Sequence, residues 1–295
     1  MKRHALLLLA IAAMTQLAIA NPQSILPSTW KEGYANANGI RIHYWRTEGD
    51  KPPLVLLHGF SDDGLCWTTI ARELTDRFDI IMPDARGHGL SDRHNKEDPA
   101  DVQVEDLRGL IESLELKDPI VMGHSMGSSS AAWFAARYPS IPKAVILVDP
   151  RLVQRDPSES ARRSSIDYQK SRAASILERN NMDYESLFDT QMKKFPHWGL
   201  TELHFWVISK QRHHPNTAYR DSSRQPSIEK SFAQIIRPTL ILKADGPKDL
   251  QAKNHAVASI LRDGSLIHIE GAGHSVHRDR KDLFLEALNA FLNRH

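Results

Sequence analysis

Short apolar segments alternate with longer, mixed segments along most of this chain. The apolar segments predict strands at residues 40–45, 54–57, 79–82, 120–122, 144–148, 239–243 and 266–269. The segments between them predict helices at residues 69–74, 103–114, 128–137 and 282–292. Several of the strands have no polar side, which is typical of strands covered on both faces. The pattern therefore predicts an α/β fold, a mostly parallel, doubly wound sheet with helices on both faces.

Residues 151–234 break this alternation. The segment is polar, contains many Arg, Ser and Gln residues, and predicts helices rather than strands. Ligands of open α/β sheets bind beyond one end of the sheet. We therefore expect residues 21–150 and 235–295 to form the core, and residues 151–234 to form a helical cap that shapes a pocket. The alternative is a helical insertion with no part in binding.

The first twenty residues have a different pattern. Lys2 and Arg3 precede an apolar run from Leu6 to Ile19, and the run ends in a small-x-small cleavage sequence at Ala20. This predicts that residues 1–20 are a signal peptide and that the protein is secreted or periplasmic. A membrane anchor is the alternative, but the run is shorter than the roughly 20 residues that span a bilayer. We therefore expect no stable membrane anchor after cleavage.

Composition narrows the range of partners. The formal charge of +2 is too small to favour a nucleic-acid partner, which leaves a small-molecule substrate open. The single cysteine, Cys66, excludes an internal disulfide, and its apolar neighbours predict a buried thiol. The 15 histidines do not assemble into a recognisable ligand set. The sequence therefore predicts no metal and no cofactor, and it leaves the oligomeric state open.

The strongest chemical signal is the G-x-S-x-G motif formed by residues 123–127. It lies directly between the predicted strand 120–122 and the helix that begins near residue 128. A sharp turn between a strand and a helix exposes the serine hydroxyl, and the free N–H groups of the helix start face developing negative charge. The motif therefore predicts that Ser125 is a nucleophile.

Four segments together resemble the α/β-hydrolase superfamily. They are Leu57–Phe60, Pro83–Asp92, Gly123–Gly127 and Gly271–Ser275, and they occur in the order usual for that family. The resemblance covers nearly all of the chain after residue 20 and is weakest over residues 151–234. It is specific for the fold and much less specific for the substrate.

The resemblance implies roles for particular residues. Ser125 would be the nucleophile and His274 the base, and the backbone N–H groups of Phe60 and Met126 would form the oxyanion hole. No cofactor is needed for this chemistry.

The resemblance also places the acid of the triad after the penultimate strand of the sheet. Asp245 ends the predicted strand 239–243, in an Ala-Asp-Gly-Pro sequence that resembles one family variant, and it is our choice for the acid. Asp249 and Asp149 remain as alternatives; Asp149 follows the preceding strand.

The resulting expectation is a serine hydrolase that cleaves a small to medium carboxylic ester or lactone through an acyl-enzyme on Ser125. Carbon–carbon bond or amide hydrolysis by the same triad remains an alternative, as does a non-catalytic protein that binds a small ligand. Haloalkane dehalogenases and epoxide hydrolases of this fold use an aspartate nucleophile, so Ser125 argues against both.

Overall fold

The computed structural model describes residues 25–153, 156–219 and 226–295. The predicted signal peptide, residues 1–20, therefore lies outside the described residues. In those described ranges, no helix is both long and apolar enough to cross a membrane.

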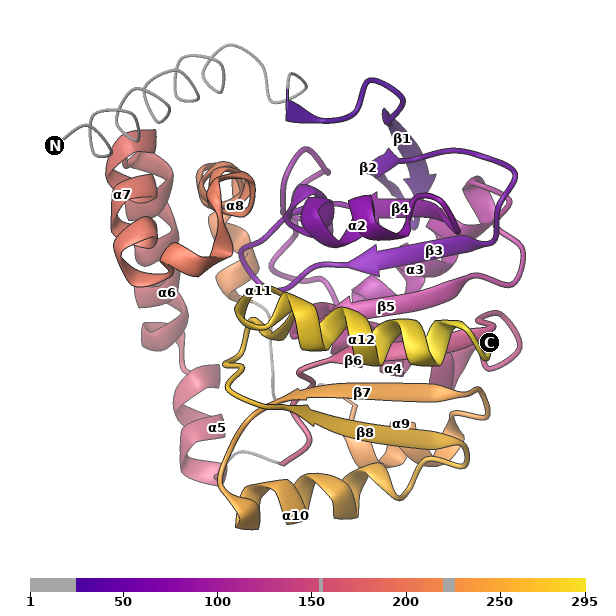
Figure 1. The fold of residues 1–295 in the computed structure, drawn as a ribbon. Helices are drawn as coiled ribbons and strands as arrows, with labels where there is room; N and C mark the ends of the chain where they lie inside the picture. The colour runs from indigo at the N-terminus through magenta and orange to yellow at the C-terminus, as the bar shows by residue number, and fades with distance from the viewer. Residues whose placement is uncertain (1–24, 154–155, 220–225) are drawn as a thin grey trace, which may run out of the picture.

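A single twisted sheet forms the centre of the molecule (Figure 1). Within the described residues it has eight strands in the order β1-β2-β4-β3-β5-β6-β7-β8. Strand β2 is antiparallel to both of its neighbours, and all other pairs are parallel. The strands are β1 (Lys31–Ala37), β2 (Ile40–Arg46), β3 (Pro53–Leu57), β4 (Asp79–Pro83), β5 (Ile120–His124), β6 (Ala144–Val148), β7 (Thr239–Ala244) and β8 (Gly264–Ile269).

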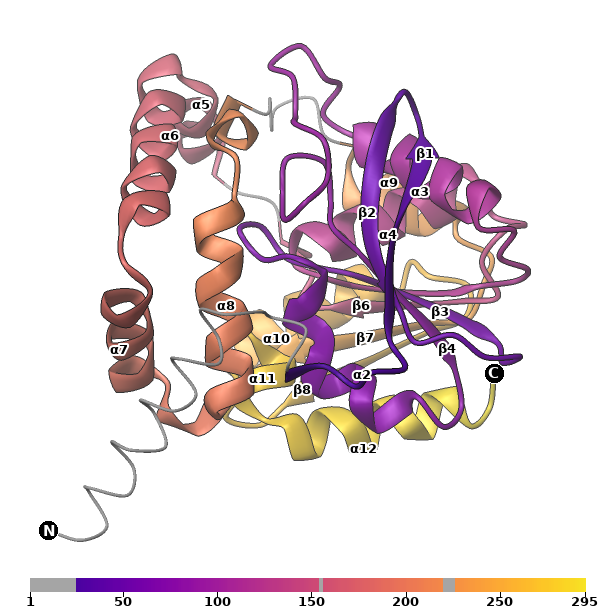
Figure 2. The same cartoon turned by 90° about the horizontal axis from the view of Figure 1, so that it is seen from above.

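Helices cover both faces of this sheet (Figure 2). One face carries α2 (Thr68–Leu74) and α12 (Lys281–Leu292), and the other carries α3 (Val102–Ser113), α4 (Met126–Arg137) and α9 (Ile228–Gln234). Helix α10 (Lys248–Ala258) lies beside β8 at the edge of the sheet. Side chains alternate between the faces along each strand: Leu54 and Leu56 enter one core cluster, and Val55 enters the other. The predicted α/β fold with a mostly parallel sheet is confirmed.

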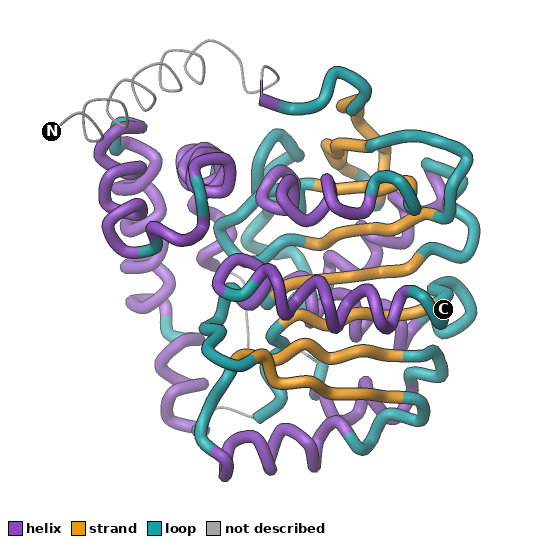
Figure 3. The backbone as a smooth tube through the Cα atoms, viewed as in Figure 1, coloured by secondary structure: helices purple, strands orange, loops and turns teal. Residues whose placement is uncertain are grey.

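The helical insertion lies beyond the carboxyl ends of the parallel strands (Figures 1 and 3). Its helices are α5 (Pro157–Ser164), α6 (Ile166–Asn181), α7 (Tyr184–Lys194) and α8 (Leu200–Arg212), with the short 3-10 turns η3 (Pro196–Trp198) and η4 (Pro215–Tyr219). Helix α9, placed in the insertion by the sequence, packs instead against α4 in the core. Its Phe232 is fully buried there, so α9 is part of the helical layer on that face of the sheet.

Candidate active site

Ser125 occupies a tight turn between β5 and α4. Its backbone has φ 53 and ψ −107, a left-handed region that a residue with a Cβ adopts only under strain. The turn is held by the Ser125 N–H, which donates to the carbonyl of Val148 on the neighbouring strand at 2.9 Å. Strained backbone of this kind needs a surrounding structure that fixes it, and here strand β6 supplies part of that structure.

The two glycines of the motif are required by close backbone approach. A Cβ on Gly123 would lie 2.2 Å from the carbonyl oxygen of Gly127. A Cβ on Gly127 would lie 2.3 Å from the carbonyl oxygen of Leu57, at the end of β3. Any side chain at either position would push the turn away from the sheet, so the spacing of the glycines follows from packing.

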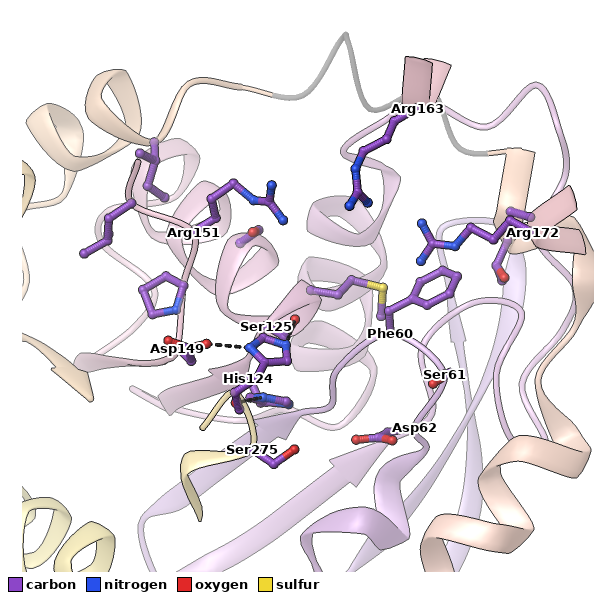
Figure 4. Close-up of a pocket in the computed structure, with 18 of the residues that line it drawn as sticks. Phe60, Ser61, Asp62, His124, Ser125, Asp149, Arg151, Arg163, Arg172 and Ser275 are labelled. Carbon is purple, nitrogen blue, oxygen red and sulfur yellow. Dashed lines mark hydrogen bonds and ion pairs between the residues drawn. The ribbon is translucent and has the colours of Figure 1, made fainter. Parts of the chain in front are cut away.

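His274 joins Ser125 to a carboxylate. The Nε2 atom of His274 lies 2.9 Å from Oγ of Ser125, and its Nδ1 atom lies 2.5 Å from Oδ2 of Asp149 (Figure 4). His274 stands in the loop between β8 and α11 (Val276–Asp279), and Asp149 directly follows β6. The three side chains thus come from loops at the carboxyl ends of different strands, and they form a continuous hydrogen-bonded chain.

Electrostatics keep Asp149 ionised. Burial alone would raise its pKa, but the hydrogen bond from His274 and the contact with the Lys243 ammonium outweigh burial and lower the pKa to about 2. The backbone N–H of Ala244 also donates to the carboxylate at 3.1 Å. An ionised Asp149 accepts the Nδ1 proton of His274, which leaves Nε2 free to accept the proton of the Ser125 hydroxyl.

The expectation that Asp245 partners His274 is wrong. The Asp245 carboxylate instead accepts backbone N–H groups of Gly271 at 2.9 Å and Gly246 at 2.7 Å, and so ties two loops together. Those hydrogen bonds lower the pKa of this exposed carboxyl. Asp249 lies in the first turn of α10. The partner is Asp149, the alternative one strand earlier, because β6 lies between β5 and β7 and its end is closest to the elbow.

The two residues expected to form the oxyanion hole both border Ser125. A Cβ on Gly59 would lie 3.5 Å from Cβ of Ser125, so the segment that leads into Phe60 passes directly beside the nucleophile. Met126 is the first residue of α4, and the N–H groups of a first helical turn have no acceptor within the helix. The roles of Phe60 and Met126 as donors to an oxyanion stay a prediction.

A cavity of about 880 Å³ opens above Ser125. Its floor contains Ser125, His274 and Phe60, and cap residues such as Tyr168 and Trp206 line it from the other side. Several arginines also point into it (Figure 4). Sequence analysis did not identify these arginines as site residues. The sequence shows that residues 151–234 contain many arginines, but it does not indicate which of their side chains face the cavity.

The described residues that line the cavity include no cluster of metal ligands. Across residues 25–153, 156–219 and 226–295, no three His, Cys, Asp or Glu side chains gather as metal ligands would. Cys66 is buried, as expected, and burial raises the pKa of its thiol, so it is no second nucleophile at neutral pH.

Comparisons with known proteins agree with this fold. The sequence profile of the alpha/beta hydrolase family matches residues 54–287. Epoxide hydrolase 1 of Caenorhabditis elegans is 26% identical over 329 positions, which cover 100% of this chain and 79% of that protein. The 2-(acetamidomethylene)succinate hydrolase of Mesorhizobium japonicum is 23% identical over 84% of this chain and 90% of its own length. A thermophilic esterase from Thermogutta terrifontis superimposes with a TM-score of 0.72 at 21% identity, covering 90% of this chain and 98% of the esterase.

Proposed function

The chain belongs to the alpha/beta hydrolase family, and from this we propose that it is a serine hydrolase with Ser125 as its nucleophile. The substrate would be a small to medium carboxylic ester or lactone. One observation carries the proposal: the hydrogen-bonded chain from Asp149 through His274 to Ser125, whose hydroxyl faces the cavity. A nucleophile, a base and a group that orients the base are the parts that acyl transfer requires.

The first half of the reaction acylates the enzyme. Oγ of Ser125 attacks the carbonyl carbon while its proton passes to Nε2 of His274, and the carbonyl oxygen becomes an oxyanion. The N–H groups of Phe60 and Met126 would hold that oxyanion. The bond to the leaving alkoxide then breaks, and His274 returns the proton to it. In a lactone the released hydroxyl stays attached to the acyl group.

The second half releases the acid. A water molecule gives a proton to His274 and attacks the acyl carbon, and a second oxyanion forms at the same place. When the bond between the carbon and Oγ of Ser125 breaks, His274 protonates Oγ. Asp149 stabilises the imidazolium form of His274 in both halves and stays ionised throughout, in keeping with its low pKa.

Amide hydrolysis is the second candidate. The same steps cleave an amide when the leaving group is an amine, and one relative is named as a hydrolase of a substrate with an acetamido group. The similarity to an epoxide hydrolase does not change the proposal, because this chain has Ser125 at the elbow, where epoxide hydrolases of this fold use an aspartate. Comparing matched ester and amide substrates in the purified protein would rank the two candidates.

The proposed nucleophile can be tested without knowing the substrate. We expect a fluorophosphonate probe to label the wild-type protein at Ser125 and the Ser125→Ala variant not at all. Ser129→Ala is the matched control, because Ser129 lines the same cavity four residues later and should leave labelling intact. Labelling that persists in Ser125→Ala, or a correctly folded wild type that is never labelled, would refute the proposal.

A further inference from the structure

The cavity above Ser125 contains carboxylates that already have cationic partners. Asp149 contacts Lys243 and His274. Asp62 contacts Lys210 at 2.7 Å and Arg278 at 3.1 Å. These groups balance one another, so they leave little net charge in the cavity.

Four further guanidinium groups line the same cavity: those of Arg151, Arg163, Arg172 and Arg179. Asp62 and Asp149 are the only acidic side chains that the described residues contribute to its lining, and both already contact other cations. The described residues provide no ion pair to Arg172 or Arg179, so these two give the cavity an excess of positive charge. An arginine stays charged at any physiological pH. Positive charge that the described residues do not balance favours an anionic ligand.

Arg172 on α6 is the central member of this group. Its guanidinium lies over the ring of Phe60, 3.8 Å from the ring centroid, which places a cation beside the residue expected to form the oxyanion hole. The described part of the chain places no carboxylate within ion-pair distance of Arg172. Burial lowers the pKa of Arg172, and the neighbouring charges of Arg163 and Arg179 lower it further. Half-buried cations that repel one another are stabilised by a bound anion.

The other arginines converge from different elements. Arg151, which follows β6, and Arg172 point into the cavity from opposite sides, and Arg163, from α5, enters between them from the top of the view (Figure 4). Arg163 also contacts Glu159 one turn earlier on its own helix, at 2.8 Å. A planar guanidinium can bind a carboxylate or a phosphate through two parallel hydrogen bonds.

We propose that the substrate of this hydrolase is anionic, and that Arg172 binds a carboxylate or phosphate group on its acyl portion. The inference rests on the proposed serine chemistry and names the class of molecule on which that chemistry acts. Its placement follows from the site: His274 protonates the leaving group, so the leaving group lies on the side of His274 and Asp149. Phe60 and Arg172 lie on the other side of Ser125, where the acyl group must extend (Figure 4).

Binding tests the inference without any turnover. Succinate, glutarate, adipate and inorganic phosphate would be titrated into the Ser125→Ala protein by calorimetry. We expect at least one of them to bind, and Arg172→Met in the same background to weaken that binding tenfold or more. Lys170→Met is the control: it removes a charge from an exposed position of the same helix, outside the cavity lining, and should change affinity less than twofold. Tighter binding of phosphate than of any dicarboxylate would identify phosphate as the anion, and the reverse would identify a carboxylate.

Turnover tests the placement on the acyl side. Mono-4-nitrophenyl adipate and 4-nitrophenyl 6-methylheptanoate share a leaving group and a similar shape, and differ in carrying a carboxylate or an isopropyl group. We expect kcat/KM of the wild type to favour the adipate at least tenfold. Arg172→Met should abolish most of this preference for the adipate, chiefly by raising its KM. Arg172→Lys should retain part of the preference.

The outcomes separate this inference from the proposed function. If none of the anions binds, or if Arg172→Met leaves both the affinity and the ratio unchanged, the inference is overturned even when Ser125 reacts with the fluorophosphonate. If the anions bind through Arg172 but Ser125 is never labelled, the proposed function fails and the anion site stands.

Discussion

Asp149 is the residue that orients the base of the candidate site through its carboxylate. One of its oxygens accepts from His274 and the other from Ala244, and Lys243 contacts it as well. Its backbone has φ 46, so the chain turns sharply at the end of β6 to direct the side chain toward the imidazole. Asp245, by contrast, uses its oxygens to hold the backbone of two loops.

These contacts predict different consequences for two matched substitutions. Asp149→Asn should lower kcat for ester hydrolysis by about 10³–10⁴, because an amide cannot fix the same imidazole tautomer or stabilise the imidazolium. Asp245→Asn should lower kcat by no more than about threefold, since its carboxylate does not touch His274. Steady-state kinetics with a 4-nitrophenyl ester would measure both values. Equal losses, or a larger loss in Asp245→Asn, would contradict the assignment of Asp149.

At the scale of elements, buried charges fasten the cap helix α8 to the core. Glu202 accepts from Thr69 of α2 at 2.6 Å and from Arg278 of α11 at 2.5 Å. Lys210, at the other end of α8, donates to Asp62 in the loop after β3 at 2.7 Å. Opposite charges lower the pKa of Asp62 and raise that of Arg278, although burial opposes both effects. The position of α8, and with it one wall of the cavity, depends on this network.

Removing one carboxylate from the network should be costly. Asp62→Asn leaves Lys210 buried without the carboxylate that it contacts, and we expect a loss of about 3–5 kcal/mol in the free energy of unfolding. Glu112→Gln, which breaks the exposed pair with Arg108 on α3, is the control and should cost less than about 1 kcal/mol. Urea unfolding of both variants would compare them. Similar values for the two would show that the buried network does not hold the cap.

At the scale of the whole molecule, histidines make the free energy of unfolding depend on pH. Burial lowers the pKa of eight of them. The pKa falls to about 4 for His124 and His204 and to about 2 for His213, and it is also lowered for His58, His88, His214, His268 and His277. The folded state therefore keeps these rings neutral at pH values where the unfolded chain protonates them. His43 acts in the opposite sense: despite burial, the carboxylates of Asp84 and Glu32 raise its pKa.

The lowered pKa values of these histidines predict that the protein loses stability at a pH well above the range in which carboxylates titrate. Below pH 6.5, the ordinary pKa of histidine, the unfolded chain binds more protons than the folded one, so this contribution to stability is complete above that pH and falls toward pH 4. Each such histidine contributes a slope of about 1.4 kcal/mol per pH unit, and we expect a total above about 3 kcal/mol per unit near pH 5. Urea unfolding at several values between pH 5 and 8 would measure this slope. Constant stability over that range would show that the buried rings are charged in the folded state.

Local patterns predicted most of the sheet because the buried strands are short, apolar and bounded by turns. Among the elements that escaped this reasoning, β1 and α10 show why. Strand β1 lies at the edge of the sheet and buries only alternate residues at its end, so its sequence has little apolar content. Helix α10 packs beside β8 through few buried positions, Asn254 and Ala258, and its apolar face is correspondingly weak.

The amino-acid sequence by itself determined the α/β fold and the elbow at Ser125, because these depend on periodicity and on backbone geometry that glycines permit locally. His274 was expected from the family resemblance of residues 271–275, and the structure brings it to Ser125. The signal peptide, which lies outside the described residues, stays a prediction. Only the tertiary structure decided that Asp149 rather than Asp245 meets His274, and that Arg172 lies over Phe60 in the cavity. Both depend on which loops converge at the carboxyl edge of the sheet, and strand order and helix packing fix that convergence over more than a hundred residues of chain.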